Sequence, residues 1–181
     1  LENPAEVHAG GANLRKQLEN MKIHGVTPVV AINAFPDDKE GDLKAIAEIA
    51  EEYGARSARC THFADGGAGA ANLAEAVADA ALEPSSFAPL YGDDVSLRDK
   101  IRTVAQRVYG ADDVTFTAQA NKQLDTYESN GFGNLPVCIA KTHLSISSDP
   151  KLPGAPTGWT LPVREVRASV GAGFVLSLIH I

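Results

Sequence analysis

The sequence predicts an α/β protein, with a mostly parallel sheet flanked by helices and a smaller α/β subdomain. Amphipathic helical stretches alternate with short β-prone runs, the order typical of strand–helix–strand units. The clearest of these runs, 26–32, is rich in β-branched residues, as in strands buried on both faces of a parallel sheet. A glycine cluster at 66–69 then joins a short strand-like stretch to a strongly helical one.

The composition fits a folded protein and argues against several classes. The 181 residues are 44% hydrophobic, which is enough for a core, and the net charge of -7 argues against nucleic acid or an anionic membrane as partner. No apolar run reaches the roughly 18 residues of a membrane span, and the first residues do not resemble a signal peptide. Cys60 and Cys138 lack metal-ligand spacing, so we expect a cytoplasmic location.

The first half predicts helices over 12–24, 42–53 and 70–82, with strands over 26–32 and within 55–63. Asn33 follows the first strand at its carboxyl end, where open parallel sheets bind ligands, although a turn-forming role explains an Asn equally well. Gly66 and Gly67 offer backbone N–H groups to an anion, or simply form a tight strand-to-helix turn. No Gly-Lys-Ser or Gly-Lys-Thr follows them, so this is not a Walker loop.

The second half follows a proline-rich linker at 84–94. It predicts helices over 96–109, capped by Ser96, and 117–129, then strands within 134–142 and over 161–170, with a loop at 149–158 between them. Arg164 and Arg167 lie three residues apart, so on a single strand they would face opposite sides, and an ion pair with Glu165 is the simpler role for at least one of them.

Two aromatic residues stand next to glycine, Phe132 in Gly-Phe-Gly and Trp159 in Thr-Gly-Trp-Thr. Such rings can form a platform for a flat ligand, although an ordinary place in the core explains them as well. Lys141 and Thr142 end the intervening strand-like run and could contact an anionic group of that ligand. The alternative is that Lys141 is simply a solvated cation. Nothing in the sequence pattern pairs His62 or His143 with a nucleophile, so a structural role is the simpler interpretation and we assign neither a catalytic role.

Nearly the whole chain resembles the formate–tetrahydrofolate ligase (formyltetrahydrofolate synthetase) family. The resemblance lies in the phrases VVAINAFPDD, CTHFADGGAGAANLA, KIRTVAQRVYGADDV, GFGNLPVCIAKTH and PTGWTLPVREVRASVGAGF. The family's glycine-lysine-threonine phosphate loop is missing from these residues, and the segment 176–181 departs from the family pattern. Together with a start that lacks Met, these features predict a carboxyl-side fragment with a truncated or artefactual end.

The resemblance implies an enzyme that joins formate to tetrahydrofolate with MgATP, by way of formyl phosphate, to give 10-formyltetrahydrofolate. It implies that the pterin stacks between Phe132 and Trp159, in a slot lined by Leu135 and Pro136. The residues implied near the nucleotide are Asn33, Gly66 and Gly67, and those implied at an anion are Lys141 and Thr142. A monovalent cation is a further ligand to consider, and we expect the full-length protein to be a homo-oligomer.

In domain terms, the resemblance makes 1–83 the carboxyl part of a nucleotide-binding domain, an incomplete P-loop NTPase-like part. The segment 84–94 is then the linker, and 95–181 the folate-binding subdomain. We expect this chain alone not to turn over. The alternative is a non-catalytic nucleotide- or folate-binding module of the same fold, which an upstream phosphate loop in the full gene would exclude.

Overall fold

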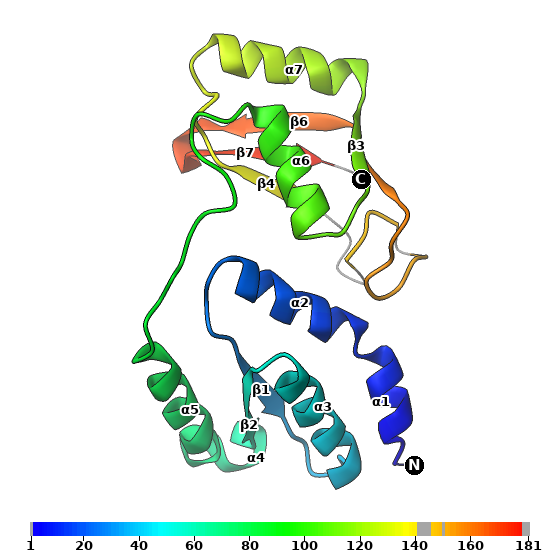
Figure 1. Ribbon diagram of the computed structural model, residues 1–181, viewed down its shortest axis with the longest axis vertical. Coiled ribbons are helices and arrows are strands. Elements are labelled where there is room, and N and C mark those ends of the chain that lie inside the picture. Colours follow the sequence, from blue (N-terminus) through cyan, green and yellow to red (C-terminus); the bar gives the residue numbers. More distant parts are fainter. Residues whose placement is uncertain (1, 141–145, 150, 179–181) are drawn as a thin grey trace. The chain divides into compact units, whose positions relative to one another are not determined.

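The computed structural model describes residues 2–140, 146–149 and 151–178. The chain forms two compact units, Leu1–Ala88 and Pro89–Ile181, and the division between them falls within the segment 84–94 (Figure 1). Both are α/β, with small parallel sheets flanked by helices, which confirms the predicted class. Among the helices of the described residues, none has the length and apolar character that a membrane span needs.

The first unit is a β–α–β arrangement with further helices around it. Its strands are β1 (Val29–Asn33) and β2 (Arg56–Cys60), and its helices are α1 (Pro4–Gly10), α2 (Ala12–Ile23), α3 (Glu40–Glu52), α4 (His62–Asp65), the 3-10 turn η1 (Gly66–Ala70) and α5 (Ala71–Ala81). The two strands are parallel and paired from Val29 with Arg56 to Asn33 with Cys60. Their carboxyl ends therefore lie at one edge, which we call the carboxyl edge.

The second unit packs two helices, α6 (Leu97–Arg107) and α7 (Ala118–Ser129), with five strands. These strands are β3 (Asp113–Phe116), β4 (Val137–Ala140), β5 (Thr160–Val163), β6 (Glu165–Ser169) and β7 (Phe174–Leu178), and the 3-10 turn η2 (Val170–Ala172) joins the last two. β3 and β5 pair in parallel. In the other sheet β7 lies in the middle, parallel to β4 and antiparallel to β6. One core cluster unites both sheets and both helices, with Ile101, Leu124 and Val175 fully buried.

The predicted single strand over 161–170 is wrong, because the chain changes sheets at Arg164. The Arg164 N–H donates to the Leu178 carbonyl at 3.0 Å, and the Arg164 carbonyl accepts from Thr117 Oγ1 at 2.6 Å. β5 therefore ends on one side of this residue and β6 begins on the other. The expected ion pair is present, with Arg167 Nε 2.8 Å from Glu165 Oε1.

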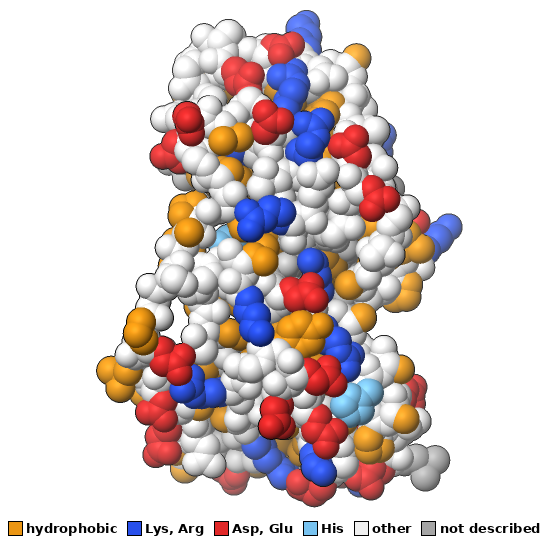
Figure 2. All heavy atoms as spheres, in the orientation of Figure 1, with side chains coloured by type: hydrophobic (Ala, Val, Ile, Leu, Met, Phe, Trp, Pro, Cys, Tyr) orange, Lys and Arg blue, Asp and Glu red, His pale blue; other side chains and the backbone are white. Residues whose placement is uncertain are grey.

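Charged side chains of both signs are interspersed over the visible face of each unit in Figure 2. The sequence as a whole has 16 Lys and Arg residues and 23 Asp and Glu residues. Charge therefore marks no site on this face, and a site has to be found from backbone geometry and from individual side chains.

The segment that departs from the family pattern supplies most of a central strand, since β7 runs to Leu178. Within it, the Ser177 hydroxyl is fully buried and has no hydrogen-bond partner among the described residues. A buried hydroxyl without a partner costs about 1 to 3 kcal/mol of stability. Ser147 is buried to the same degree, but its hydroxyl accepts from the Asp149 N–H at 3.2 Å and donates to the Asp149 carbonyl at 2.9 Å.

We predict that Ser177→Ala raises the free energy of unfolding by about 1 kcal/mol, because it removes a desolvated hydroxyl that gains nothing in return. Ser147→Ala is the matched control and should lower the free energy of unfolding by a similar amount, since its hydroxyl is bonded. Urea denaturation of the two variants measures both. Destabilisation by Ser177→Ala would show that its hydroxyl is in fact bonded.

Candidate ligand-binding site

Phe132 is fixed in place by the end of helix α7. Gly131 has φ +82°, a left-handed conformation that glycine adopts without strain. The Phe132 N–H donates to the Tyr127 carbonyl at 2.9 Å, and the Gly131 N–H donates to the Glu128 carbonyl at 3.1 Å. These are the two bonds of a Schellman motif, so the backbone of Phe132 has a defined position directly after the helix.

The loop that follows, 132–136, is held by a buried lysine. Lys100 lies on α6 with none of its surface exposed, and its Nζ donates to the carbonyls of Gly133 at 2.8 Å and Leu135 at 3.2 Å. A third bond, 3.0 Å long, goes to the Asp93 carbonyl. Burial lowers the pKa of the Lys100 ammonium below its ordinary value, against the opposing effect of nearby carboxylates. The structure thus gives this loop a cationic anchor.

Sequence reasoning missed Lys100, although its position held a signal. The apolar residues of this helical stretch recur at helical spacing and form a stripe. They are Leu97, Ile101, Val104, Ala105 and Val108. Lys100 lies on the same face, three residues after Leu97 and four before Val104. A lysine inside an apolar helix face has to find acceptors for its donors.

Trp159 is positioned by local bonds and by the core. It follows Gly158, which has φ +76°, and its indole Nε1 donates to the Pro156 carbonyl at 3.0 Å. Its own carbonyl accepts from the Asp112 N–H at 2.8 Å. Trp159 and Leu135 are both partly buried against the core cluster of the second unit. Packing in the core therefore explains the position of part of each side chain, as the alternative to a ligand-binding role expects.

The remaining residues of the predicted folate slot are more open. Phe132 is half-buried, and Pro136 is exposed while its carbonyl accepts from the Val175 N–H at 2.9 Å. No other described aromatic ring stacks on Phe132 or Trp159. Lys141 and Thr142, the predicted anion contacts, lie outside the described residues.

The predicted nucleotide residues gather at the carboxyl edge of the first unit. Asn33 ends β1 and is exposed, and exposed Gly66 and Gly67 follow the end of β2. A Cβ atom added at Gly67 would meet nothing within 4 Å, whereas one at Gly69 would lie 2.6 Å from backbone and side-chain atoms of Thr61. Gly69 is thus required by packing, and Gly67 is open to a ligand.

Two exposed phenylalanines belong to the segments that leave this carboxyl edge, and sequence reasoning missed them as well. The rings of Phe35 and Phe63 lie 5.2 Å apart at 57°, and the two residues are 49% and 70% exposed. Phe35 comes two residues after Asn33, and Phe63 three residues after Cys60. The position of each phenylalanine, two or three residues after a strand end, was the available signal.

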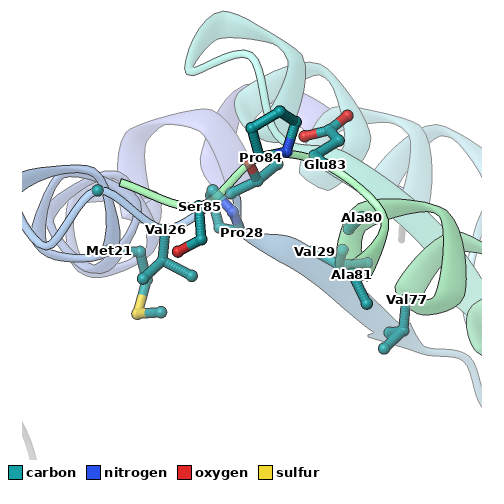
Figure 3. A pocket seen from close by; sticks show the side chains of 12 residues that line it. Met21, Val26, Pro28, Val29, Val77, Ala80, Ala81, Glu83, Pro84 and Ser85 are labelled. Carbon is teal, nitrogen blue, oxygen red and sulfur yellow. The ribbon is translucent and has the colours of Figure 1, made fainter. Parts of the chain in front are cut away.

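A hollow of about 410 Å³ lies elsewhere in the first unit, at the amino end of β1 (Figure 3). Its lining is mostly apolar and comes from the segment Val26–Val29 and from Val77, Ala80 and Ala81 of α5. The charged residue in the lining, Glu83, is paired with Arg56. It offers no free reactive group, and we assign it no ligand.

The part of the chain that the structure describes holds no group of three or more His, Cys, Asp or Glu side chains arranged for a metal ion. We therefore derive no magnesium-dependent step from these residues.

Comparison with known proteins gives one family. A model of the formate–tetrahydrofolate ligase family matches residues 1–180. A formate–tetrahydrofolate ligase of Saccharopolyspora erythraea is 60% identical over 98% of this chain and 31% of its own length. Formate–tetrahydrofolate ligase 3 of Rubrobacter xylanophilus is 55% identical over 96% of the chain and 32% of its own length. Human cytoplasmic C-1-tetrahydrofolate synthase is 50% identical over 98% of this chain and 19% of its own length. The chain therefore spans about a third or less of these relatives.

We predict that Gly131→Ala lowers the free energy of unfolding by about 1 kcal/mol, because alanine pays a steric cost in the left-handed conformation. The matched control is Gly133→Ala. A Cβ atom there meets its nearest neighbour, Glu128 Cγ, at an ordinary 3.7 Å, so stability should hardly change. Thermal and urea denaturation of both variants test this. Equal stability of the two would contradict the role given to Gly131.

Proposed function

Because this chain belongs to the formate–tetrahydrofolate ligase family, we propose that it is part of an enzyme that joins formate to tetrahydrofolate using ATP. The proposed intermediate is formyl phosphate. The folate nitrogen attacks its carbonyl carbon, the bond from that carbon to the phosphate oxygen breaks, and inorganic phosphate and a proton leave to give 10-formyltetrahydrofolate. The names of the relatives and the family match over nearly the whole chain support this activity.

The folate side of the site belongs to the second unit in this proposal. The pterin stacks between Phe132 and Trp159, and Leu135 and Pro136 line the slot. The supporting observation is the way the loop 132–136 is fixed, by the Schellman motif at one end and by Lys100 in its middle. A preordered platform costs little entropy when a ligand arrives. Each aromatic face would contribute about 1 to 3 kcal/mol, by analogy with base stacking.

The nucleotide side belongs to the first unit, at the carboxyl edge. An Asn side chain offers both a donor and an acceptor to a base, and the open backbone at Gly66 and Gly67 allows close approach of a ligand. The 181 residues contain no glycine-lysine-threonine loop, so we assign no phosphoryl-transfer step to them and expect this chain alone not to turn over. Magnesium would neutralise phosphate charge during that step.

The proposal also covers the cellular location and the oligomeric state of the enzyme. We propose that the enzyme is cytoplasmic, as the name of the human relative says of that protein. The homo-oligomeric state of the full-length protein stays a prediction.

The folate proposal predicts that tetrahydrofolate quenches the fluorescence of this chain saturably. Trp159 is the single tryptophan of the sequence, so the tryptophan emission originates at the proposed slot. Phe132→Ala should weaken the affinity about 5- to 100-fold, because it removes one stacking face. Fluorescence titration, repeated by calorimetry, measures the dissociation constant.

Phe35→Ala is the control, since it removes an exposed ring from the other unit and should leave the affinity unchanged. Unchanged affinity in Phe132→Ala, with quenching intact, would contradict the stacking role. Saturable binding restricted to ATP would favour a nucleotide-binding module instead.

A further inference from the structure

Lys100 satisfies all of its donors with backbone oxygens. An ammonium group has three N–H bonds, and in Lys100 they meet the carbonyls of Asp93, Gly133 and Leu135 at 3.0, 2.8 and 3.2 Å. The residue is fully buried. A buried charge is costly unless it is fully hydrogen-bonded, and here two of its three bonds go to one short loop.

Tyr91 extends this anchor to the end of the same loop. Its ring centroid lies 5.7 Å from Lys100 Nζ, within cation–π range. Its hydroxyl oxygen accepts from the N–H of Val137, the first residue of β4, at 3.1 Å. The pair therefore binds the loop through two carbonyls and fixes the amide at which the strand begins.

We propose that Lys100, supported by Tyr91, is a positioning residue for folate, which holds the loop 132–136 in the shape that receives the pterin. This inference rests on the folate site proposed above. The hydrogen bonds of the lysine to this loop go to main-chain oxygens, so they leave the side chains of Phe132, Leu135 and Pro136 unoccupied by the anchor. The lysine thus sets the path of the backbone while the side chains stay available to a ligand.

The neighbouring cation on α6 shows what a purely structural role looks like. Arg98 donates to Asn121 Oδ1 at 3.2 Å, to the Asn121 carbonyl at 3.0 Å and to Asp125 Oδ1 at 2.7 Å. These partners, together with Glu128, whose Oε2 lies 3.7 Å from Arg98 Nη1, are all on α7, and none belongs to the loop 132–136. Arg98 and Lys100 are therefore a matched pair, because each joins α6 to another element, but to a different one.

The test compares Lys100→Met with Arg98→Met. Methionine keeps an unbranched chain of similar length but has no donor, so the carbonyls of Gly133 and Leu135 lose their partner. We expect Lys100→Met to bind tetrahydrofolate about tenfold more weakly at a temperature where it is fully folded. Arg98→Met should be less stable than the wild-type chain yet bind with unchanged affinity. Circular dichroism gives stability, and Trp159 fluorescence gives affinity.

Wild-type affinity in folded Lys100→Met, with weaker binding in Phe132→Ala, would overturn this inference and leave the folate site in place. Failure of the folded wild-type chain to bind tetrahydrofolate would overturn the proposed slot and this inference together. If Lys100→Met does not fold, Tyr91→Phe decides, because it keeps the ring and loses only the hydroxyl. We expect it to weaken binding about threefold, and unchanged affinity would count against the anchor.

Discussion

An ammonium group taken out of water needs an acceptor for each N–H bond, and Lys100 finds its acceptors in three main-chain carbonyls rather than in carboxylates. This choice ties three segments together: the turn at Asp93, helix α6 and the loop before β4. Loop carbonyls outside a sheet have no regular partner, so a single cation replaces the hydrogen bonds that a strand would have supplied. The shape of the loop 132–136 depends on these hydrogen bonds from Lys100.

The two units present their candidate residues in different ways. In the first unit Asn33 and the glycine turn lie at the carboxyl edge of a parallel pair, where open α/β sheets generally bind ligands. In the second unit Phe132 and Trp159 precede β4 and β5, and so lie at the amino ends of strands. The positions of these two rings are therefore not set by the carboxyl ends of parallel strands. Left-handed glycines and the hydrogen bonds of a helix end and an indole position them instead.

The predictable parts of the fold are those that local chemistry dictates. Ser96 caps α6 as expected, because its hydroxyl accepts from the Asp99 N–H, and Gly131 stops α7. The break at Arg164 was not predictable, since it is made by bonds to residues 47 and 14 positions away, Thr117 and Leu178.

The candidate site divides in the same way. Gly-Phe-Gly and Thr-Gly-Trp-Thr mark the two rings in the sequence, but the anchor of the loop is invisible there, because it joins Lys100 to carbonyls 33 and 35 residues away. Every residue type has a main-chain carbonyl, so the sequence does not show which carbonyls accept a hydrogen bond from a lysine. A charged residue on a helix is ordinarily read as exposed, so only its place within the apolar stripe of α6 hinted at burial.

Amide hydrogen exchange of the chain, with and without saturating tetrahydrofolate, tests most directly the claim that folate binds to the second unit. The account predicts slower exchange on binding in the loop from Phe132 to Val137 and at Gly158–Trp159, with the turn at Gly66 and Gly67 unchanged. Protection confined to the carboxyl edge of the first unit, or binding without any protection of the loop, would contradict it.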